Sequence, residues 1–185
     1  MKRSLLALTL LAALPFAASA AEGVSYNFVQ GGYSATNGDG DGDADGFGID
    51  GSVAVHPNFH LFGGYSNQEI DDTNIDFDQW KFGVGYNYEI APKADLITRI
   101  AYEKFDAGSG FELDGYSAEV GVRGALTNNF EGYAMAGYED YEQLDGDFYG
   151  RVGALVKFNE TWGVNGDVKF ADGDTQWFVG PRVTW

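Results

Sequence analysis

Residues 79–89 read QWKFGVGYNYE, and apolar or aromatic side chains occupy every second position in this stretch. A period of two is typical of a β-strand whose faces meet different surroundings, whereas a helix has a period of 3.6. Trp80 and Tyr88 lie on the apolar face near its ends, and Lys81 and Asn87 lie on the polar face. The stretch therefore predicts a two-faced strand about as long as a tilted strand that crosses a bilayer.

The same alternation recurs along the chain and predicts an all-β, antiparallel protein. Ten segments show it, at residues 23–35, 46–55, 58–68, 78–89, 95–105, 115–126, 130–140, 147–158, 162–171 and 175–185. Each has about the 9–11 residues that a transmembrane strand needs. An even number of strands leaves both chain ends on one side of a membrane. We expect ten strands, and eight remain possible.

Alternation alone would also fit a water-soluble β-sandwich, so the positions of the aromatic residues are decisive. One set lies on the apolar face beside the longer connections: Phe47, Tyr65, Trp80, Tyr102, Tyr116, Tyr138, Phe148, Phe170 and Trp177. A second set lies beside the short turns: Phe59, Tyr88, Phe130, Phe158, Trp162 and Trp185. The two belts are roughly 20–25 Å apart for tilted strands, which is the height of a lipid-facing band. The sequence thus predicts a transmembrane outer-membrane β-barrel.

Residues 1–20 have the composition of a secretory signal peptide. Lys2 and Arg3 precede an apolar stretch, and Ala18-Ser19-Ala20 has the small-residue pattern of a cleavage site. The alternative, a membrane anchor helix, needs about 20 apolar residues, and the apolar stretch here is shorter. We therefore expect cleavage after Ala20, and residues 21–185 to form a single barrel domain in the outer membrane of a Gram-negative cell or in its vesicles.

The composition excludes several classes of function. The chain has no Cys, which excludes disulfides, thiolate metal sites and Cys nucleophiles. Its formal net charge of −17 disfavours nucleic acid as a partner, because nucleic-acid binders need clustered Lys and Arg. The only two histidines, His56 and His60, lie beside a predicted short turn, away from the acidic connections. No catalytic triad can be assembled across a membrane, so we expect no enzymatic activity.

Predicted short turns alternate with longer connections near residues 36–46, 69–77, 106–114 and 141–146. Most acidic residues adjoin the longer connections, which are expected outside the cell. The simplest explanation is solvation. The alternative is that carboxylates collect Ca²⁺ or Mg²⁺ and bridge to lipopolysaccharide. The weak divalent-cation site would use Asp39, Asp41, Asp43 and Asp45. This run resembles half of an EF-hand loop, but Ser52 stands where a bidentate Glu is required, and no other cofactor is expected.

Charged residues also fall on the polar faces of the strands and are expected to point into the barrel. The predicted lumen network comprises Lys81, Arg99, Glu119, Arg123, Glu131, Arg151, Asp167 and Lys169. Because side chains nearly fill a barrel of eight to ten strands, we expect ion pairs. A narrow ion-conducting path is the alternative.

The last strand, TQWFVGPRVTW, alternates back from a terminal aromatic residue. Gly180, Val183 and Trp185 match the signal that the barrel-assembly machinery recognises, which implies this machinery and periplasmic chaperones as partners. Pro181 departs from the expected pattern because it removes a hydrogen-bond donor from a strand that must close the barrel.

The chain as a whole resembles a small outer-membrane family of Xanthomonas and Stenotrophomonas. The blocks that carry the resemblance are AEGVSYNFVQGGY, DADGFG, HPNFHLFGGYSNQEIDDTNIDFDQW, AYEKFDAG, GYEDYEQLDGDFYGRVGA and DTQWFVGPRVTW. The resemblance implies a barrel once put forward as a sulfated quorum signal and activator of rice immunity, with contact to a host receptor. The proposed sulfated residue matches Tyr26.

Tyr26 also has a structural interpretation. It shares a face with Val24 and Phe28 and is expected to point at lipid as a belt residue, where a permanent anion would be costly. The main functional prediction is a structural and interaction protein of the outer membrane, with an indirect effect on biofilm or virulence. The alternatives are a secreted or vesicle-borne signal from the N-terminal segment and a narrow channel for small solutes.

Overall fold

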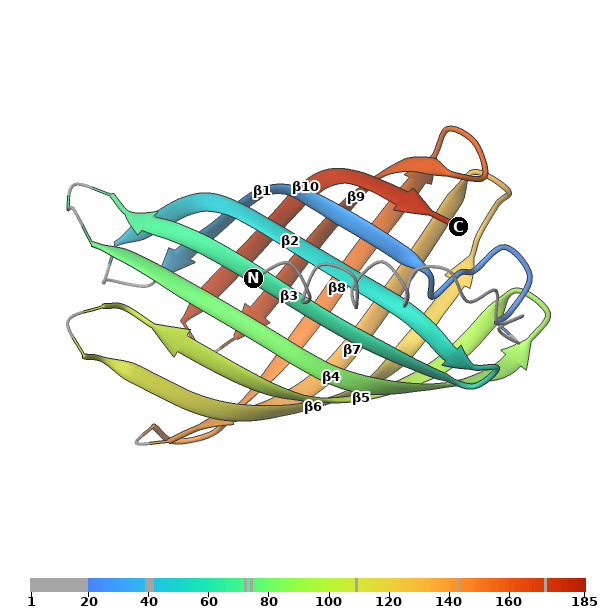
Figure 1. Cartoon of the computed structure of the whole chain (residues 1–185). Helices are drawn as coiled ribbons and strands as arrows, with labels where there is room; N and C mark the ends of the chain where they lie inside the picture. Colours follow the sequence, from blue (N-terminus) through green and yellow to red (C-terminus); the bar gives the residue numbers. More distant parts are fainter. Residues whose placement is uncertain are drawn as a thin grey trace, which may run out of the picture.

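The computed structural model describes residues 20–38, 42–71, 73, 75–108, 110–142, 144–171 and 173–185. Within these residues ten antiparallel strands close into a barrel, in which sequence neighbours pair and the first strand pairs with the last (Figure 1). The strands are β1 (Phe28–Gly38), β2 (Asp43–His56), β3 (Phe59–Ile70), β4 (Asp76–Ala91), β5 (Ala94–Asp106), β6 (Glu112–Ala125), β7 (Phe130–Tyr141), β8 (Asp147–Lys157), β9 (Trp162–Ala171) and β10 (Asp174–Thr184). Over the same ranges, no helix is long and apolar enough to cross a membrane.

Side-chain burial confirms the predicted faces. Along β4, Trp80, Phe82 and Tyr88 are exposed on the outside of the barrel. Gly85 and Asn87 point inward and are buried. Both predicted aromatic belts lie on the outer surface, and the polar side chains lie inside. An apolar outer surface around a polar interior is the arrangement of a transmembrane barrel. The chain is therefore an outer-membrane β-barrel, with ten strands rather than eight.

The two ends of the barrel differ in their connections. The turn end carries the connections at residues 57–58, 92–93, 126–129 and 158–161. The loop end carries the other five connections, and both the segment before β1 and the carboxyl terminus lie at the turn end (Figure 1). The strands extend further toward the loop end than predicted. β2 begins at Asp43 rather than residue 46, and β4 begins at Asp76 rather than residue 78. Many acidic residues assigned to loops therefore lie on strand ends, because strand pairing continues beyond the apolar band.

The first predicted strand is wrong at its start. The sequence predicts strand from residue 23, but β1 begins at Phe28, and residues 20–27 lie in the lumen at the turn end. Val24, Tyr26 and Phe28 are buried rather than lipid-facing. A period of two separates two faces without saying which face meets lipid, and here the apolar face fills the mouth of the barrel.

β1 and β10 close the barrel at a point where glycines on both strands allow a close approach of the backbones. The pairing runs from Phe28 with Thr184 to Gly38 with Asp174. A Cβ atom on Gly180 would lie 2.2 Å from the carbonyl oxygen of Gly31, and one on Gly32 would lie 2.1 Å from that of Val179. Only glycine fits at such distances, so these residues permit ring closure beside Pro181.

Candidate functional site: the barrel lumen

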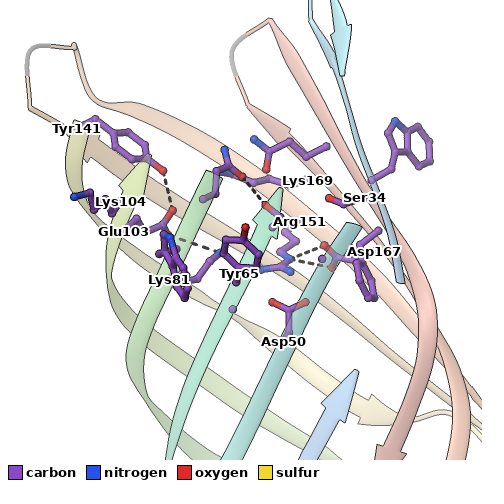
Figure 2. A pocket seen from close by; sticks show the side chains of 18 residues that line it. Ser34, Asp50, Tyr65, Lys81, Glu103, Lys104, Tyr141, Arg151, Asp167 and Lys169 are labelled. Atoms are coloured by element: carbon purple, nitrogen blue, oxygen red, sulfur yellow. Dashed lines mark hydrogen bonds and ion pairs between the residues drawn. The ribbon is translucent and has the colours of Figure 1, made fainter. Parts of the chain in front are cut away.

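The loop-end half of the lumen contains a buried acid from β5 and a partly buried acid from β7. Glu103 accepts hydrogen bonds from Ser117 Oγ at 2.5 Å and Tyr141 Oη at 2.8 Å, and Lys81 lies 3.8 Å away. Lys169 forms an ion pair with Glu139 at 2.5 Å. Figure 2 shows Lys81, Glu103 and Tyr141 on one side of this region and Lys169 on the other. Charged groups from both walls therefore converge across the lumen.

Two Arg–carboxylate pairs, each between neighbouring strands, line the middle of the lumen. Arg99 Nη1 lies 3.2 Å from Glu119, which also accepts a hydrogen bond from Tyr149 Oη at 3.1 Å. Arg151 Nε contacts the two carboxylate oxygens of Asp167 at 2.8 and 2.9 Å (Figure 2). Tyr133 donates a further hydrogen bond to Asp167. Each buried acid thus has a cation and a neutral donor, as buried charges require.

Nearer the turn end, Glu131 holds two cations. Its side chain is only 2% exposed, and it lies 2.5 Å from Arg123 Nη2 and 3.2 Å from Lys157 Nζ. These groups come from β6, β7 and β8. One buried carboxylate therefore ties three consecutive strands together from inside.

The structure places all eight residues of the predicted lumen network inside the barrel and brings six of them together as Arg99–Glu119, Arg123–Glu131 and Arg151–Asp167. Lys81 and Lys169 instead pair with Glu103 and Glu139. The predicted network omits these two acids because both lie close to the acidic connections near residues 106–114 and 141–146, to which the sequence pattern assigns most acidic residues. Both acids lie at inward positions of the predicted segments 95–105 and 130–140, so applying the alternation up to the ends of these segments identifies both.

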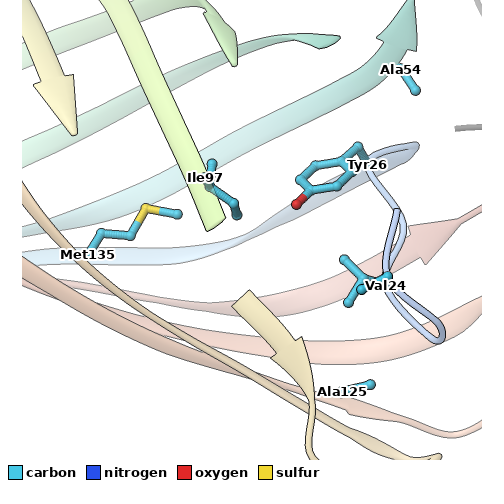
Figure 3. Packing of buried hydrophobic residues seen from close by; sticks show 7 residues of the cluster. Val24, Tyr26, Ala54, Ile97, Ala125 and Met135 are labelled. Carbon is cyan, nitrogen blue, oxygen red and sulfur yellow. The ribbon is translucent and has the colours of Figure 1, made fainter. Parts of the chain in front are cut away.

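The turn end of the lumen is partly filled by residues 20–27 and the side chains around them. Tyr26 is 0% exposed, its ring stacks on His60 with centroids 4.5 Å apart, and its hydroxyl donates to Asp95 Oδ2 at 2.9 Å. Val24, Ile97 and Met135 belong to the same buried cluster (Figure 3). We call residues 20–27 the plug segment. The stacked rings and the cluster close the mouth of the barrel with side chains.

The expected lipid-facing position of Tyr26 is therefore wrong. Burial raises the pKa of the Tyr26 phenol above its ordinary value, so the hydroxyl keeps the proton that it donates to Asp95. A sulfate ester at this atom would set a permanent anion against a buried carboxylate. The folded barrel thus opposes sulfation at Tyr26, because the phenol hydroxyl is buried and already donates its hydrogen bond to Asp95.

Three cavities follow one another along the lumen. A cavity of about 100 Å³ lies toward the loop end, and one of about 50 Å³ lies in the middle. They share Asp50, Lys81 and Arg151 as lining residues. A third, of about 510 Å³, lies at the turn end beside the plug segment and meets the middle cavity only at Arg123. Arg123 and the plug segment therefore separate the two halves of the lumen.

The middle cavity is strongly basic. Its charged lining residues are Asp50, Lys81, Arg99, Arg123, Arg151 and Arg182. Arg182 Nε donates to Gln30 at 2.7 Å, and its guanidinium carbon lies 4.0 Å from the centre of the Phe28 ring. Arg182 Nη1 is buried and has no hydrogen-bond partner among the residues that the structure describes. Lys81, Arg99, Arg123 and Arg151 are each paired with an acid, so among the described residues Arg182 is the one base of this lining without an ion pair.

The remaining predicted site residues lie at the surface or at the barrel closure. Asp39 and Asp41 lie outside the described residues, and Asp43 and Asp45 are exposed on β2. Among the residues that the structure describes, no group of three or more His, Cys, Asp or Glu could hold a metal ion. A weak Ca²⁺ or Mg²⁺ site thus stays a prediction.

The predicted assembly signal lies in and just after β10. Gly180 is buried at the closure with β1, Val183 pairs with Val29, and Trp185 donates its backbone N–H to the Asn27 carbonyl at 3.2 Å. These positions give Gly180 and Trp185 structural roles in the closed barrel. Recognition by the assembly machinery stays a prediction. His56 is exposed at the turn end, whereas His60 is buried against Tyr26.

Comparison with protein-family models and with curated proteins gives no match. Among solved structures, the chain is similar to the KdgM porin, with 13% sequence identity and a TM-score of 0.47 over 85% of this chain and 99% of the porin. The translocator domain of the autotransporter NalP from Neisseria meningitidis gives 11% identity and a TM-score of 0.44, covering 98% of this chain and 96% of that one. Ail of Yersinia pestis gives 10% sequence identity and a TM-score of 0.38, covering 87% of this chain and 100% of Ail. Identities and scores this low carry no argument about function.

Proposed function

We propose that this protein is a structural and interaction barrel of the outer membrane, with a lumen closed to solutes and an acidic loop end facing outward. The observation that carries the proposal is the closure of the turn end by the Tyr26–His60 stack and the plug segment. Behind this closure, ion pairs between nearby strands line the lumen: Arg151 on β8 pairs with Asp167 on β9, and Lys169 on β9 pairs with Glu139 on β7. A barrel held together in this way acts through its surfaces rather than as an open pore.

The surfaces available for interaction differ at the two ends. At the loop end, Asp43, Asp45 and Asp76 are exposed on strand ends. The bases Lys104 and Lys169 in this region are both paired with acids, Lys104 with Glu112 at 2.6 Å and Lys169 with Glu139 at 2.5 Å. A strongly negative outer rim disfavours anionic partners and favours cationic ones. This charge supports the interaction role.

Conductance in a planar lipid bilayer tests the closed lumen. The folded protein, recognised by heat-modifiable gel mobility, is expected to give no steady conductance under conditions in which a general porin of known conductance gives stepwise openings. Vesicles that contain the protein should also fail to swell in small sugars. Stable single-channel steps from the purified barrel would refute the proposal.

A second function, passage of small anions, is favoured by the aligned cavities and by the basic middle cavity. It requires displacement of the plug segment, because only Arg123 lines both the middle and turn-end cavities. The reversal potential in a KCl gradient distinguishes the two functions. A chloride-selective current in the native protein would favour the second function, and its loss in Arg182→Gln would assign the selectivity to that arginine.

A further inference from the structure

Asp95 is a buried carboxylate at the turn end for which the ion-pair network supplies no cation. It is 0% exposed and lies near the start of β5. It takes part in none of the ion pairs among the described residues. Arg123 is its partner in strand register, but the Arg123 guanidinium contacts Glu131 at 2.5 Å. A buried carboxylate without a cation is costly, so the missing positive charge needs a source.

The donors that Asp95 does have come from the plug segment. The backbone nitrogen of Ala21 lies 3.1 Å from Oδ1 and 3.3 Å from Oδ2, and the Tyr26 hydroxyl lies 2.9 Å from Oδ2. Ala21 is itself only 1% exposed. Both donors are neutral in an unbroken chain. The nitrogen that faces the carboxylate is the one that the predicted cleavage after Ala20 would release.

We propose that Asp95 is the binding site for the α-ammonium group of Ala21, which forms when the Ala20–Ala21 peptide bond is hydrolysed. Signal peptidase adds water across this bond, so that Ala20 gains a carboxylate and the Ala21 amine takes up a proton. The neutral amide donor becomes a cation with three N–H groups at the same position. The hydrolysis thus supplies the positive charge that the buried carboxylate lacks.

The contacts around Ala21 hold its nitrogen in place. The next residue, Glu22, donates its backbone N–H to the Pro92 carbonyl at 2.8 Å, and Val24 donates back to the Ala21 carbonyl at 3.0 Å. Ala21 also belongs to the buried cluster that contains Ala125. These backbone hydrogen bonds and the packing of Ala21 therefore hold the plug segment in place next to Asp95. Processing of the leader then locks this segment in the barrel, whether or not the lumen conducts.

Amine labelling tests the proposal without a mutation. The chain is exported with its own leader, extracted from outer membranes, and its intact mass is compared with that of a chain starting at Ala21. An acylating reagent selective for α-amino groups is then applied to the folded and the urea-unfolded protein. We expect the folded protein to react at least about tenfold more slowly. A different first residue, or equal labelling of the folded and unfolded protein, would overturn the proposal.

Two variants separate an ion pair from simple burial. The first carries Gly-Ser between residues 20 and 21, so that cleavage leaves the amino group two residues away while Ala21 keeps a neutral amide. The second is Asp95→Asn, which keeps the shape and removes the charge. Each alone is expected to lower the temperature of the gel-mobility transition by roughly 5–10 °C.

The double variant, which carries both the insertion and Asp95→Asn, decides the mechanism. If the α-amino group and Asp95 form one ion pair, either change alone abolishes it, so that the effects of the two changes are not additive. The insertion is expected to have almost no further effect in the Asp95→Asn chain. If the insertion lowers the transition equally in both backgrounds, the α-amino group and Asp95 act independently and the proposal fails. Asp95→Asn also has a matched control in Tyr26→Phe, which removes the other donor and leaves the charges unchanged.

Discussion

Glu131→Gln is expected to be one of the most destabilising charge changes in the lumen. Glu131 is 2% exposed and contacts two cations, Arg123 at 2.5 Å and Lys157 at 3.2 Å. Glutamine keeps the shape and one acceptor oxygen but removes the negative charge, which leaves two cations close together. Removing one partner of a buried ion pair costs about 3–5 kcal/mol. We expect the free energy of unfolding to fall by roughly that amount.

The assay is urea unfolding of the protein in lipid vesicles, followed by tryptophan fluorescence. All four tryptophans, Trp80, Trp162, Trp177 and Trp185, are exposed on the outer surface, so their emission reports loss of lipid contact. Glu112→Gln is the matched control, because the Lys104–Glu112 pair is solvent-exposed and such pairs contribute little. Equal urea midpoints for the two variants would show that the lumen pair contributes no more than a surface pair, and would refute the reasoning.

Two further changes test the plug segment and the barrel closure. Tyr26→Phe removes one hydrogen bond to the buried Asp95 and should lower the free energy of unfolding by about 1.5–3 kcal/mol. The exposed Tyr116→Phe serves as its control, and an unchanged midpoint for Tyr26→Phe would count against the hydrogen bond. Gly180→Ala places a Cβ 2.2 Å from the Gly31 carbonyl oxygen, whereas Gly166→Ala meets nothing within 4 Å. Gel-mobility shift assays should therefore show much less folded Gly180→Ala than Gly166→Ala, and similar yields would contradict the proposed close approach.

Much of the fold could be predicted because a transmembrane barrel is encoded by local patterns. The alternation in β4, with Trp80 outward and Lys81 inward, depends only on neighbouring residues. The same holds for the short turns and for both aromatic belts. Ion pairs between the two strands of a hairpin can also be predicted from the sequence. The Arg123–Glu131 pair is an example, because it spans one tight connection.

The beginning of the chain could not be predicted from local patterns. Val24, Tyr26 and Phe28 alternate like a lipid-facing strand, yet all three are buried inside. Because polar groups face inward in most of the lumen, an apolar alternation predicts a surface that faces lipid. At the turn end an apolar cluster closes the mouth instead, and the alternation has the same appearance in either case.

The sequence by itself determined the class of protein, the two belts and the charged lumen, because each follows from a period of two and from residue type, whereas the structure decided between ten strands and eight. Only the tertiary structure decided which charges meet and what closes the barrel. Tyr26 and Asp95 are 69 residues apart in the chain, and Tyr133 and Asp167 are 34 apart. Such partners are chosen by the curvature and register of the closed sheet, which bring non-neighbouring strands and the plug segment within reach of one side chain.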